Sequence, residues 1–273
     1  MPGQILGDRY EVEQQLGKKS GRWTLLARDL TTQDPVILKI LCIDDEMVAD
    51  DLKLFKREVE TLQTLDYPAT PRYLGYFEID LPKSGKALAL IQSYMEGTSL
   101  QTYLQQGRVF SQAEAQQIAA AILQILSYLH DHQPSIVHRD IKPSNILLNG
   151  STDAPTAGQM YLIDFGSVRL SVPSEFTTMS LVGTDGYMPP EQIGRRAVKA
   201  SDLYSLGVTL IAALSGLPPT RLPREDGIRI DVERSVSCAP EFAAWLQQIT
   251  EPELHKRFSS VQAALTALMA LES

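Results

Sequence analysis

The segment His138-Arg139-Asp140-Ile141-Lys142-Pro143-Ser144-Asn145 places a carboxylate, an ammonium group and a side-chain amide close together in the chain. The apolar run Ile146-Leu147-Leu148 follows it, and Asp164-Phe165-Gly166 comes after a further loop. A lone Asp-Phe-Gly triplet arises by chance in roughly a few per cent of chains of this length, whereas the five specified residues of the first segment do so in roughly one chain in ten thousand. The two segments together therefore indicate a chemical site.

Short β-rich runs separated by turn residues dominate the chain before about Ser99. We expect strands at residues 10–16, 23–29, 36–43, 73–79 and 88–94. One helix interrupts them, from Asp50 to about Leu65, because apolar residues recur there at helical spacing. This pattern predicts a five-stranded, mostly antiparallel sheet with one helix.

The pattern after Ser99 is helical. Ser111 and Glu114 form the signature of a helix start, and a second helix over residues 203–214 should open at Asp202 and end at Gly216. A last helix should follow Ser259 or Ser260. We therefore expect an α+β fold of two lobes within one domain of residues 1–273: a small antiparallel β-sheet lobe over about 1–95, and a larger, mainly helical lobe over about 96–273.

Composition excludes several function classes. The chain has 25 Lys and Arg against 33 Asp and Glu, and the net charge of -8 argues against nucleic acid as a partner. Its apolar runs fall short of the ~20 residues that span a bilayer, and its start does not read as a signal peptide. Cys42 and Cys238 lack the spacing of a disulfide framework or a zinc site. These features predict a cytoplasmic protein without a membrane span.

The segments at 138–145 and 164–166 resemble the catalytic loop and the metal-binding loop of protein kinases. The resemblance implies that Asp140 accepts or orients the proton of the attacking hydroxyl group, and that Lys142 steadies the transferred phosphoryl group. It also implies that Asn145 and Asp164 hold Mg²⁺, or Mn²⁺, through oxygen ligands. Lys142 at this position points to Ser/Thr rather than Tyr substrates.

Two further stretches carry the same resemblance. Val36-Ile37-Leu38-Lys39 resembles the strand that ends on the ATP-binding lysine of kinases, and Glu58 on the predicted helix is its expected partner. The stretch from Gly183 to Glu191 resembles the end of a kinase activation segment. The resemblance implies positioning roles for Thr184, for an ion pair between Glu191 and Arg257, and for Asp202 as a cap on the catalytic loop.

The glycine-rich loop of the family is incomplete here. Gly17 and Thr24 align with it, but Lys19 and Arg22 occupy the second and third glycine positions, and Gly21 lies one residue away. Side chains at these positions should loosen the approach of the backbone to the phosphates of ATP. Either the basic side chains partly compensate by attracting phosphate, or they form a solvated basic turn.

The resemblance also places the adenine site. Ser93 and Met95 take the positions whose backbone binds the base, and Gln92 takes that of the gatekeeper. Leu16, Ile37 and Leu147 should sandwich the purine, for which an apolar slot is required.

Arg139 implies regulation, because in this family such an arginine often pairs with a phosphate on the activation segment. Thr177, Thr178 and Ser180 are the candidate phosphorylation sites, against the alternative of an unmodified polar loop. A homodimer would allow autophosphorylation.

The resemblance runs from about Tyr10 to Leu268 and is to the Ser/Thr protein kinases, particularly the compact eukaryotic-like (Hanks-type) kinases of bacteria. It implies an enzyme that transfers the γ-phosphoryl group of ATP to Ser/Thr hydroxyls of proteins. One alternative is a pseudokinase scaffold, motivated by the incomplete glycine loop. A small-molecule phosphotransferase is disfavoured by Thr184, Glu191 and Arg257.

Overall fold

A computed structural model describes residues 2–19, 21–43, 49–80, 85–151, 153–170, 186–194 and 196–271, without the side chains at 19, 49, 50, 169 and 170. The chain divides into two compact units, Met1–Met95 and Glu96–Ser273. The boundary lies where the sequence pattern changes from strands to helices.

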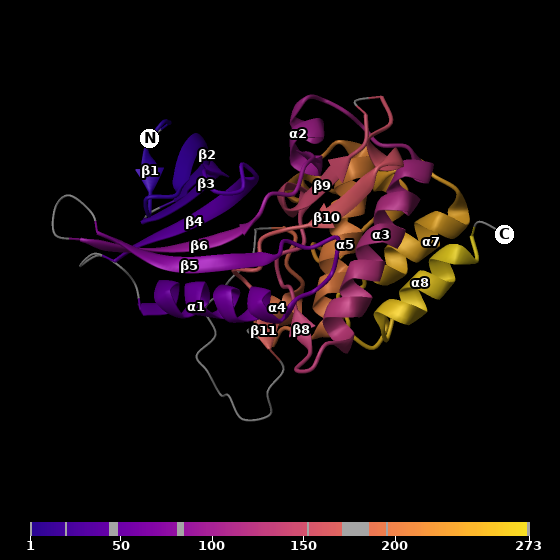
Figure 1. The fold of residues 1–273 in the computed structure, drawn as a ribbon. Coiled ribbons are helices and arrows are strands. Elements are labelled where there is room, and N and C mark those ends of the chain that lie inside the picture. The colour runs from indigo at the N-terminus through magenta and orange to yellow at the C-terminus, as the bar shows by residue number, and fades with distance from the viewer. Residues whose placement is uncertain are drawn as a thin grey trace. The chain divides into compact units, whose positions relative to one another are not determined.

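The first unit is built on a six-stranded antiparallel sheet with the strand order β1-β2-β3-β4-β6-β5 (Figure 1). The predicted five strands are present, and the sheet gains a short strand at its edge. Their bounds are β1 (Ile5–Leu6), β2 (Tyr10–Lys19), β3 (Arg22–Asp29), β4 (Pro35–Ile43), β5 (Tyr73–Asp80) and β6 (Lys86–Ser93).

Burial explains why these residues form a sheet around one apolar core. Leu25, Leu38 and Leu90 on three neighbouring strands are fully buried, and removal of such apolar side chains from water is the main favourable contribution to folding. The helix α1 (Ala49–Thr64) lies beside β5 (Figure 1) and buries Phe55 and Leu62. The predicted helix is therefore confirmed within one residue at each end.

The second unit is mainly helical. Its longest helices, α3 and α5, pack against each other, and α7 and α8 pack beside them (Figure 1). The helices are α2 (Leu100–Gln105), α3 (Gln112–Asp131), α4 (Pro190–Ile193), α5 (Lys199–Ser215), α6 (Val232–Ser235), α7 (Pro240–Ile249) and α8 (Val261–Met269). The short strands are β7 (Thr98–Ser99), β8 (Ile136–Val137), β9 (Ile146–Asn149), β10 (Gln159–Leu162), β11 (Arg169–Leu170), β12 (Arg224–Glu225) and β13 (Arg229–Ile230).

Local capping fixes the ends of the long helices. Ser111 and Glu114 form the predicted capping box at the start of α3, and Ser260 caps α8. Gly216 ends α5 in the left-handed conformation, with φ of 67°, which glycine adopts without a Cβ penalty.

The start of α5 differs from the prediction. The helix begins at Lys199, so Asp202 lies inside its first turn and is not the N-cap. The hydroxyl of Ser201 accepts the backbone N–H of Val198 instead, which leaves the Asp202 carboxylate available to other partners. Residues 201–213 are all buried, as expected of a helix that is apolar on nearly every side.

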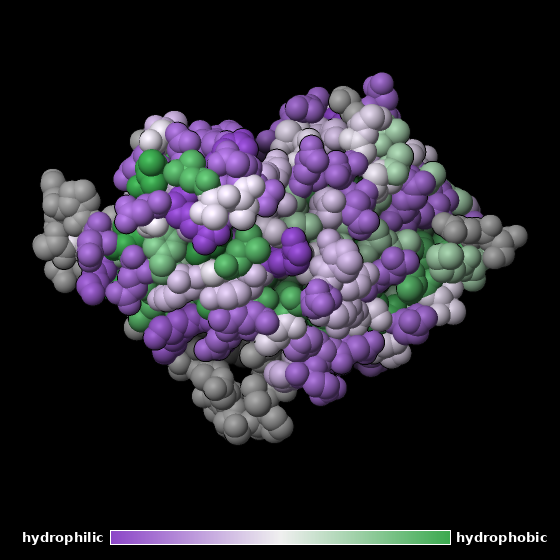
Figure 2. Space-filling model, viewed as in Figure 1, coloured by the Kyte–Doolittle hydropathy of each residue, from purple (hydrophilic) through white to green (hydrophobic). Residues whose placement is uncertain are grey.

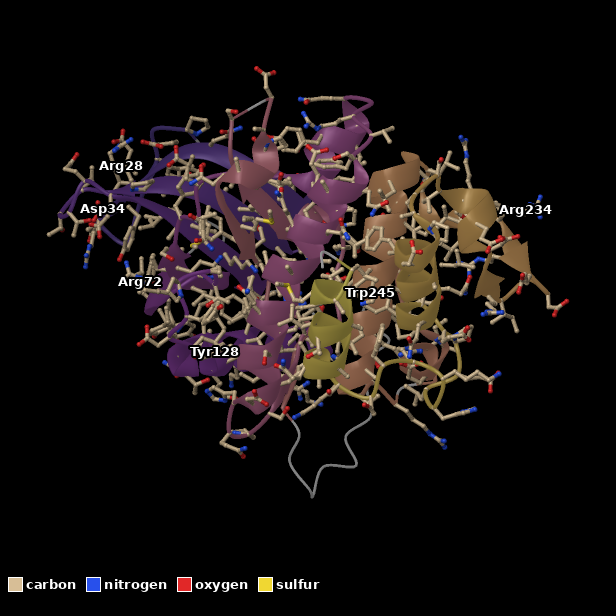
Figure 3. All side chains as sticks on the ribbon, turned by 90° about the vertical axis from the view of Figure 1, so that its right-hand side faces the viewer. Arg28, Asp34, Arg72, Tyr128, Arg234 and Trp245 are labelled. Carbon is tan, nitrogen blue, oxygen red and sulfur yellow. The ribbon has the colours of Figure 1, made fainter. Side chains whose placement is uncertain are left out.

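Hydrophilic residues cover most of the face drawn in Figure 2, and hydrophobic residues form small separate patches on it. Figure 3 shows Arg234 projecting from the second unit, where its side chain is 74% exposed, and Arg28 and Asp34 near the turn between β3 and β4. Within the described ranges, no helix combines the length and the apolar character needed to cross a bilayer.

Candidate active site

The catalytic-loop segment leaves β8 and forms a compact cluster around Asp140. The Nζ atom of Lys142 lies 2.7 Å from Oδ2 of Asp140. The Nδ2 atom of Asn145 donates to the same oxygen at 3.1 Å and to the main-chain carbonyl of Asp140 at 2.8 Å. Two donors therefore orient the carboxylate, and the structure brings together three of the residues predicted from the motif.

The pairing of β9 with β10 places Asp164 beside this cluster. Ile146 pairs with Leu162, and one step further the N–H of Ile163 donates to the carbonyl of Asn145 at 2.9 Å. Asn145 precedes one strand of this hairpin and Asp164 follows the other, so both side chains arise at the same end. The turn after β10 holds Asp164 at φ of 69°, a conformation that costs energy in a non-glycine residue.

Asp202 of α5 fixes the start of the catalytic loop. Its carboxylate, fully buried, accepts the backbone N–H groups of His138 at 2.9 Å and Arg139 at 2.7 Å. The Nε2 atom of His130 lies 2.9 Å from the same carboxylate. The expected cap is therefore present, and it holds Arg139 at φ of 68°.

His138 and Phe165 pack against each other beneath the loop. Their rings meet edge to face at 5.0 Å, and both side chains are buried. Burial lowers the pKa of His138, since it disfavours the charged imidazolium. The pair therefore acts as apolar support for the two loops.

The side chain of Arg139 is also buried, and its guanidinium donates to the main-chain carbonyls of Ser167 and Val168. Its expected partner, a phosphate on the activation segment, stays a prediction. The candidates Thr177, Thr178 and Ser180 and the positioning residue Thr184 lie outside the described residues.

Glu191 and Arg257 form the predicted ion pair. Nη1 of Arg257 donates to Oε1 of Glu191 at 2.8 Å, and Nη2 donates to Oε2 at 3.3 Å. The guanidinium also donates to three main-chain carbonyls, and it lies over the ring of Tyr204 at 5.0 Å. The pair therefore ties the start of α4 to α5 and to the loop before α8.

In the first unit, Lys39 of β4 and Glu58 of α1 form an ion pair through Nζ and Oε1. Their side chains are 16% and 7% exposed, so both charges are largely removed from water. The lysine and the glutamate stabilise each other's charge, because burial of an unpaired charge is strongly unfavourable. The contact expected from the resemblance is present.

The hairpin formed by β2 and β3 lies next to this pair. Gly17 pairs with Thr24, and Thr24 pairs in turn with Lys39 on β4. Arg22 forms an ion pair with Asp51 of α1 at 2.6 Å. No local sequence signal indicates this partner, because Asp51 is one of several acidic residues in its segment. The side chain of Lys19 is not described.

The predicted adenine-site residues belong to both units. Leu16 is exposed and Ile37 is buried in the first unit, whereas Leu147 is half-buried on β9 in the second. Ser93 ends β6, and its hydroxyl accepts the backbone N–H of Arg72 and lies 3.5 Å from the sulfur of Met95. It stays a prediction that these residues surround one adenine base. It also stays a prediction that Lys39 and Asp140 act on the same bound nucleotide.

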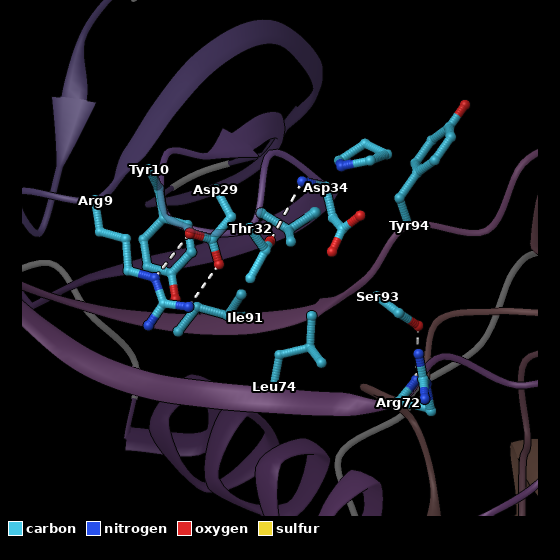
Figure 4. A pocket seen from close by; sticks show the side chains of 12 residues that line it. Arg9, Tyr10, Asp29, Thr32, Asp34, Arg72, Leu74, Ile91, Ser93 and Tyr94 are labelled. Atoms are coloured by element: carbon cyan, nitrogen blue, oxygen red, sulfur yellow. Dashed lines mark hydrogen bonds and ion pairs between the residues drawn. The ribbon is translucent and has the colours of Figure 1, made fainter.

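A pocket of about 390 Å³ in the first unit has neither Lys39 nor Glu58 among its lining residues; Figure 4 shows the side chains that line it. Arg9 and Asp29 form a two-point ion pair on its wall, at 2.8 and 2.6 Å. The Arg9 guanidinium lowers the pKa of Asp29 to about 2. Ser93 also lines this pocket, so it reaches the end of β6.

The donor set of Asn145 and Asp164 fits Mg²⁺. One carboxylate and one amide supply hard oxygen ligands, and Mg²⁺ keeps the remaining positions for water and phosphate oxygens. In the part of the chain that the structure describes, three or more His, Cys, Asp or Glu side chains nowhere gather into a complete metal cage.

Comparison with known proteins agrees with this geometry. The family model of the protein kinase domain matches residues 10–269, and the chain therefore belongs to the protein kinase domain family. Serine/threonine-protein kinase B of Synechocystis sp. is 33% identical over 96% of this chain and 46% of its own length.

Two other relatives are similar. Serine/threonine-protein kinase PknA of Nostoc sp. is 33% identical over 97% of this chain and 48% of its own length. Serine/threonine-protein kinase PrkC of Bacillus subtilis is 29% identical over 89% of this chain and 36% of its own length. The chain thus spans about half the length, or less, of these curated relatives, and the part they share is the kinase domain of bacterial Hanks-type Ser/Thr kinases.

Proposed function

We propose that this chain is a serine/threonine protein kinase that transfers the γ-phosphoryl group of ATP to Ser or Thr hydroxyls of protein substrates. The observation that carries the proposal is the cluster in which Lys142 and Asn145 orient the carboxylate of Asp140. Phosphoryl transfer requires little covalent chemistry from a protein, so positioning and charge neutralisation are its main contributions.

The catalytic and metal-binding residues then have the following roles. Asp140 accepts or orients the proton of the attacking hydroxyl, and Lys142 compensates charge on the transferred group. Asn145 and Asp164 would hold Mg²⁺, which neutralises phosphate charge. Lys39, oriented by Glu58, binds the α- and β-phosphates.

The adenine site is part of the same proposal. Ser93 and Met95 bind the base through their backbone, and Leu16, Ile37 and Leu147 contact its faces. Gly17, Lys19, Gly21, Arg22 and Thr24 lie along the hairpin that approaches the phosphates. The intact set of Lys39, Asp140, Asn145 and Asp164 favours an active enzyme over a pseudokinase scaffold.

Regulation and location extend the proposal. Autophosphorylation at Thr177, Thr178 or Ser180, within a homodimer, places a phosphate opposite Arg139 and orders the activation segment. The acidic composition favours protein over nucleic-acid partners, and a cytoplasmic location fits the low cysteine content, with only Cys42 and Cys238 in the sequence.

Phosphate transfer to peptides tests the proposal. The purified chain is incubated with ATP, Mg²⁺ and matched peptides that carry a single Ser, Thr or Tyr. We expect incorporation into the Ser and Thr peptides that depends on Mg²⁺ or Mn²⁺. Nucleotide binding without transfer to any peptide or to the chain itself would support the scaffold alternative instead.

A further inference from the structure

Arg22 ties the β2–β3 hairpin to helix α1. Its Nη2 atom donates to Oδ1 of Asp51 at 2.6 Å and to the main-chain carbonyl of Asp51 at 3.2 Å. Arg22 is the first residue of β3, and Asp51 lies in the first turn of α1. Both residues belong to the first unit, so their contact is internal to it.

The end of the hairpin is also bonded to β4. The carbonyl of Gly21 accepts the backbone N–H of Cys42 at 2.8 Å, and Arg22 pairs with Leu41. The same strand carries Lys39, which pairs with Thr24 on one side and binds Glu58 of α1 through its side chain. The hairpin, β4 and α1 therefore form a closed set of contacts around Lys39.

Asp51 and Glu58, the acids of α1 with described contacts to this set, lie seven residues apart. Positions separated by two helical turns share a face, about 10 Å apart along the axis. Asp51 and Glu58 thus hold the helix at two points, the first through Arg22 and the second through Lys39. Asp51 is also favoured where it lies, since a carboxylate in the first turn interacts well with the helix dipole.

The Arg22–Asp51 pair is partly exposed, with side chains 34% and 36% accessible. Such pairs contribute little to stability. The Nε atom of Arg22 is buried and makes no hydrogen bond to any part of the chain that the structure describes. The guanidinium contacts Asp51 through its Nη2 atom, and the effect of this contact should be on the position of the hairpin.

We propose that Arg22 and Asp51 are positioning residues for nucleotide binding: their ion pair fixes the end of the hairpin to α1 and holds it in place beside Lys39. Glycine at position 22 would have no side chain to make this contact. The arginine that stands in place of the third glycine of the loop thus supplies a tether between the hairpin and α1. This inference rests on the proposed binding of ATP phosphates by the hairpin.

Substitutions at the two ends of the pair separate this role from direct phosphate binding by Arg22. If Arg22 is a tether, Arg22→Gln and Asp51→Asn both raise the KM for ATP by about two- to fivefold, with kcat within about twofold of wild type. The charge-reversed pair Arg22→Asp with Asp51→Arg has a lower KM than either reversal alone. Glu60→Gln, an exposed acid on the same helix, is the matched control and leaves KM unchanged.

Two kinetic outcomes overturn the proposal. One is a KM that neither substitution changes. The other is a KM that rises in Arg22→Gln but falls in Asp51→Asn, because release of Arg22 from Asp51 would then improve its contact with phosphate.

Hydrogen exchange in the nucleotide-free protein tests the tether without reference to catalysis. We expect backbone amides of residues 17–24 to exchange several-fold faster in Arg22→Gln and Asp51→Asn than in Glu60→Gln. Equal exchange in all three contradicts the tether even if the wild type transfers phosphate. Faster exchange in the two variants, together with a wild-type chain that transfers no phosphate, would uphold the tether and refute only the proposed function.

Discussion

Asp202 accepts the backbone N–H of Arg139 at 2.7 Å, at a residue whose φ is 68°. A buried carboxylate on α5 thus holds the catalytic loop in a conformation that is unfavourable for arginine. Because the carboxylate accepts a second backbone N–H, from His138, an amide in its place leaves one donor facing an NH₂ group.

Asp202→Asn should therefore lower the free energy of unfolding by about 2 kcal/mol, since it leaves a buried donor unsatisfied. The variant should also transfer phosphate more slowly. Denaturant unfolding checks the first result, with the exposed Asp153→Asn of the same unit as control. Equal stability of the two variants would show that the cap is not needed to hold the loop.

Arg257→Met should be strongly destabilising. It leaves the Glu191 carboxylate partly buried without its cation, and loss of one partner of a buried pair costs about 3–5 kcal/mol. Lys256→Met is the matched control, because Lys256 pairs with Glu253 at the surface, where such a pair contributes at most about 1 kcal/mol. Similar melting temperatures for the two variants would contradict the structural role of the Glu191–Arg257 pair.

Much of this site follows from local sequence. Asp140, Lys142 and Asn145 lie within one short loop, so a motif is sufficient to predict that they cluster. Helix ends were predicted where a cap is local, as at Ser111 and Gly216. Asp202 shows the limit: its side chain binds the catalytic loop, and α5 starts at Lys199, four residues earlier than expected with Asp202 as the N-cap.

Two of the features that sequence reasoning missed depend on distant partners. Strand β1 has two residues and exists through its pairing with β2, and the contact of Arg22 with Asp51 joins positions 29 residues apart. Helix α7 did have a signal: Pro240 at its start precedes buried residues at helical spacing, namely Phe242, Trp245, Leu246 and Ile249.

The Arg9–Asp29 pair predicts a pH effect. The pKa of Asp29 is lowered from 3.8 to about 2 in the folded chain, so its contribution to stability is present above pH 4 and lost as the pH falls toward 2. Asp29→Asn should therefore melt below wild type at pH 5 to 7, and the difference should shrink between pH 4 and 2. A difference for Asp29→Asn that is constant with pH would exclude this account.

Asp164→Asn should separate metal binding from folding. Asparagine tolerates the left-handed backbone found at this position, so the fold should be retained. Loss of the carboxylate should raise the Mg²⁺ concentration needed for nucleotide binding by about tenfold or more. Titration of Mg²⁺ at fixed ATP, followed by thermal shift, measures this effect, and a response equal to that of Asp153→Asn would remove Asp164 from the metal site.

The central claim is that the carboxylate of Asp140, oriented by Lys142 and Asn145, serves phosphoryl transfer. Incorporation of radiolabelled phosphate from ATP into a generic basic protein, compared between wild type and Asp140→Asn, tests it most directly. We predict transfer by the wild type and a loss of at least about 100-fold in the variant, the usual scale of general acid–base catalysis. Equal incorporation by the two proteins would contradict the assignment of Asp140 and with it the proposed mechanism.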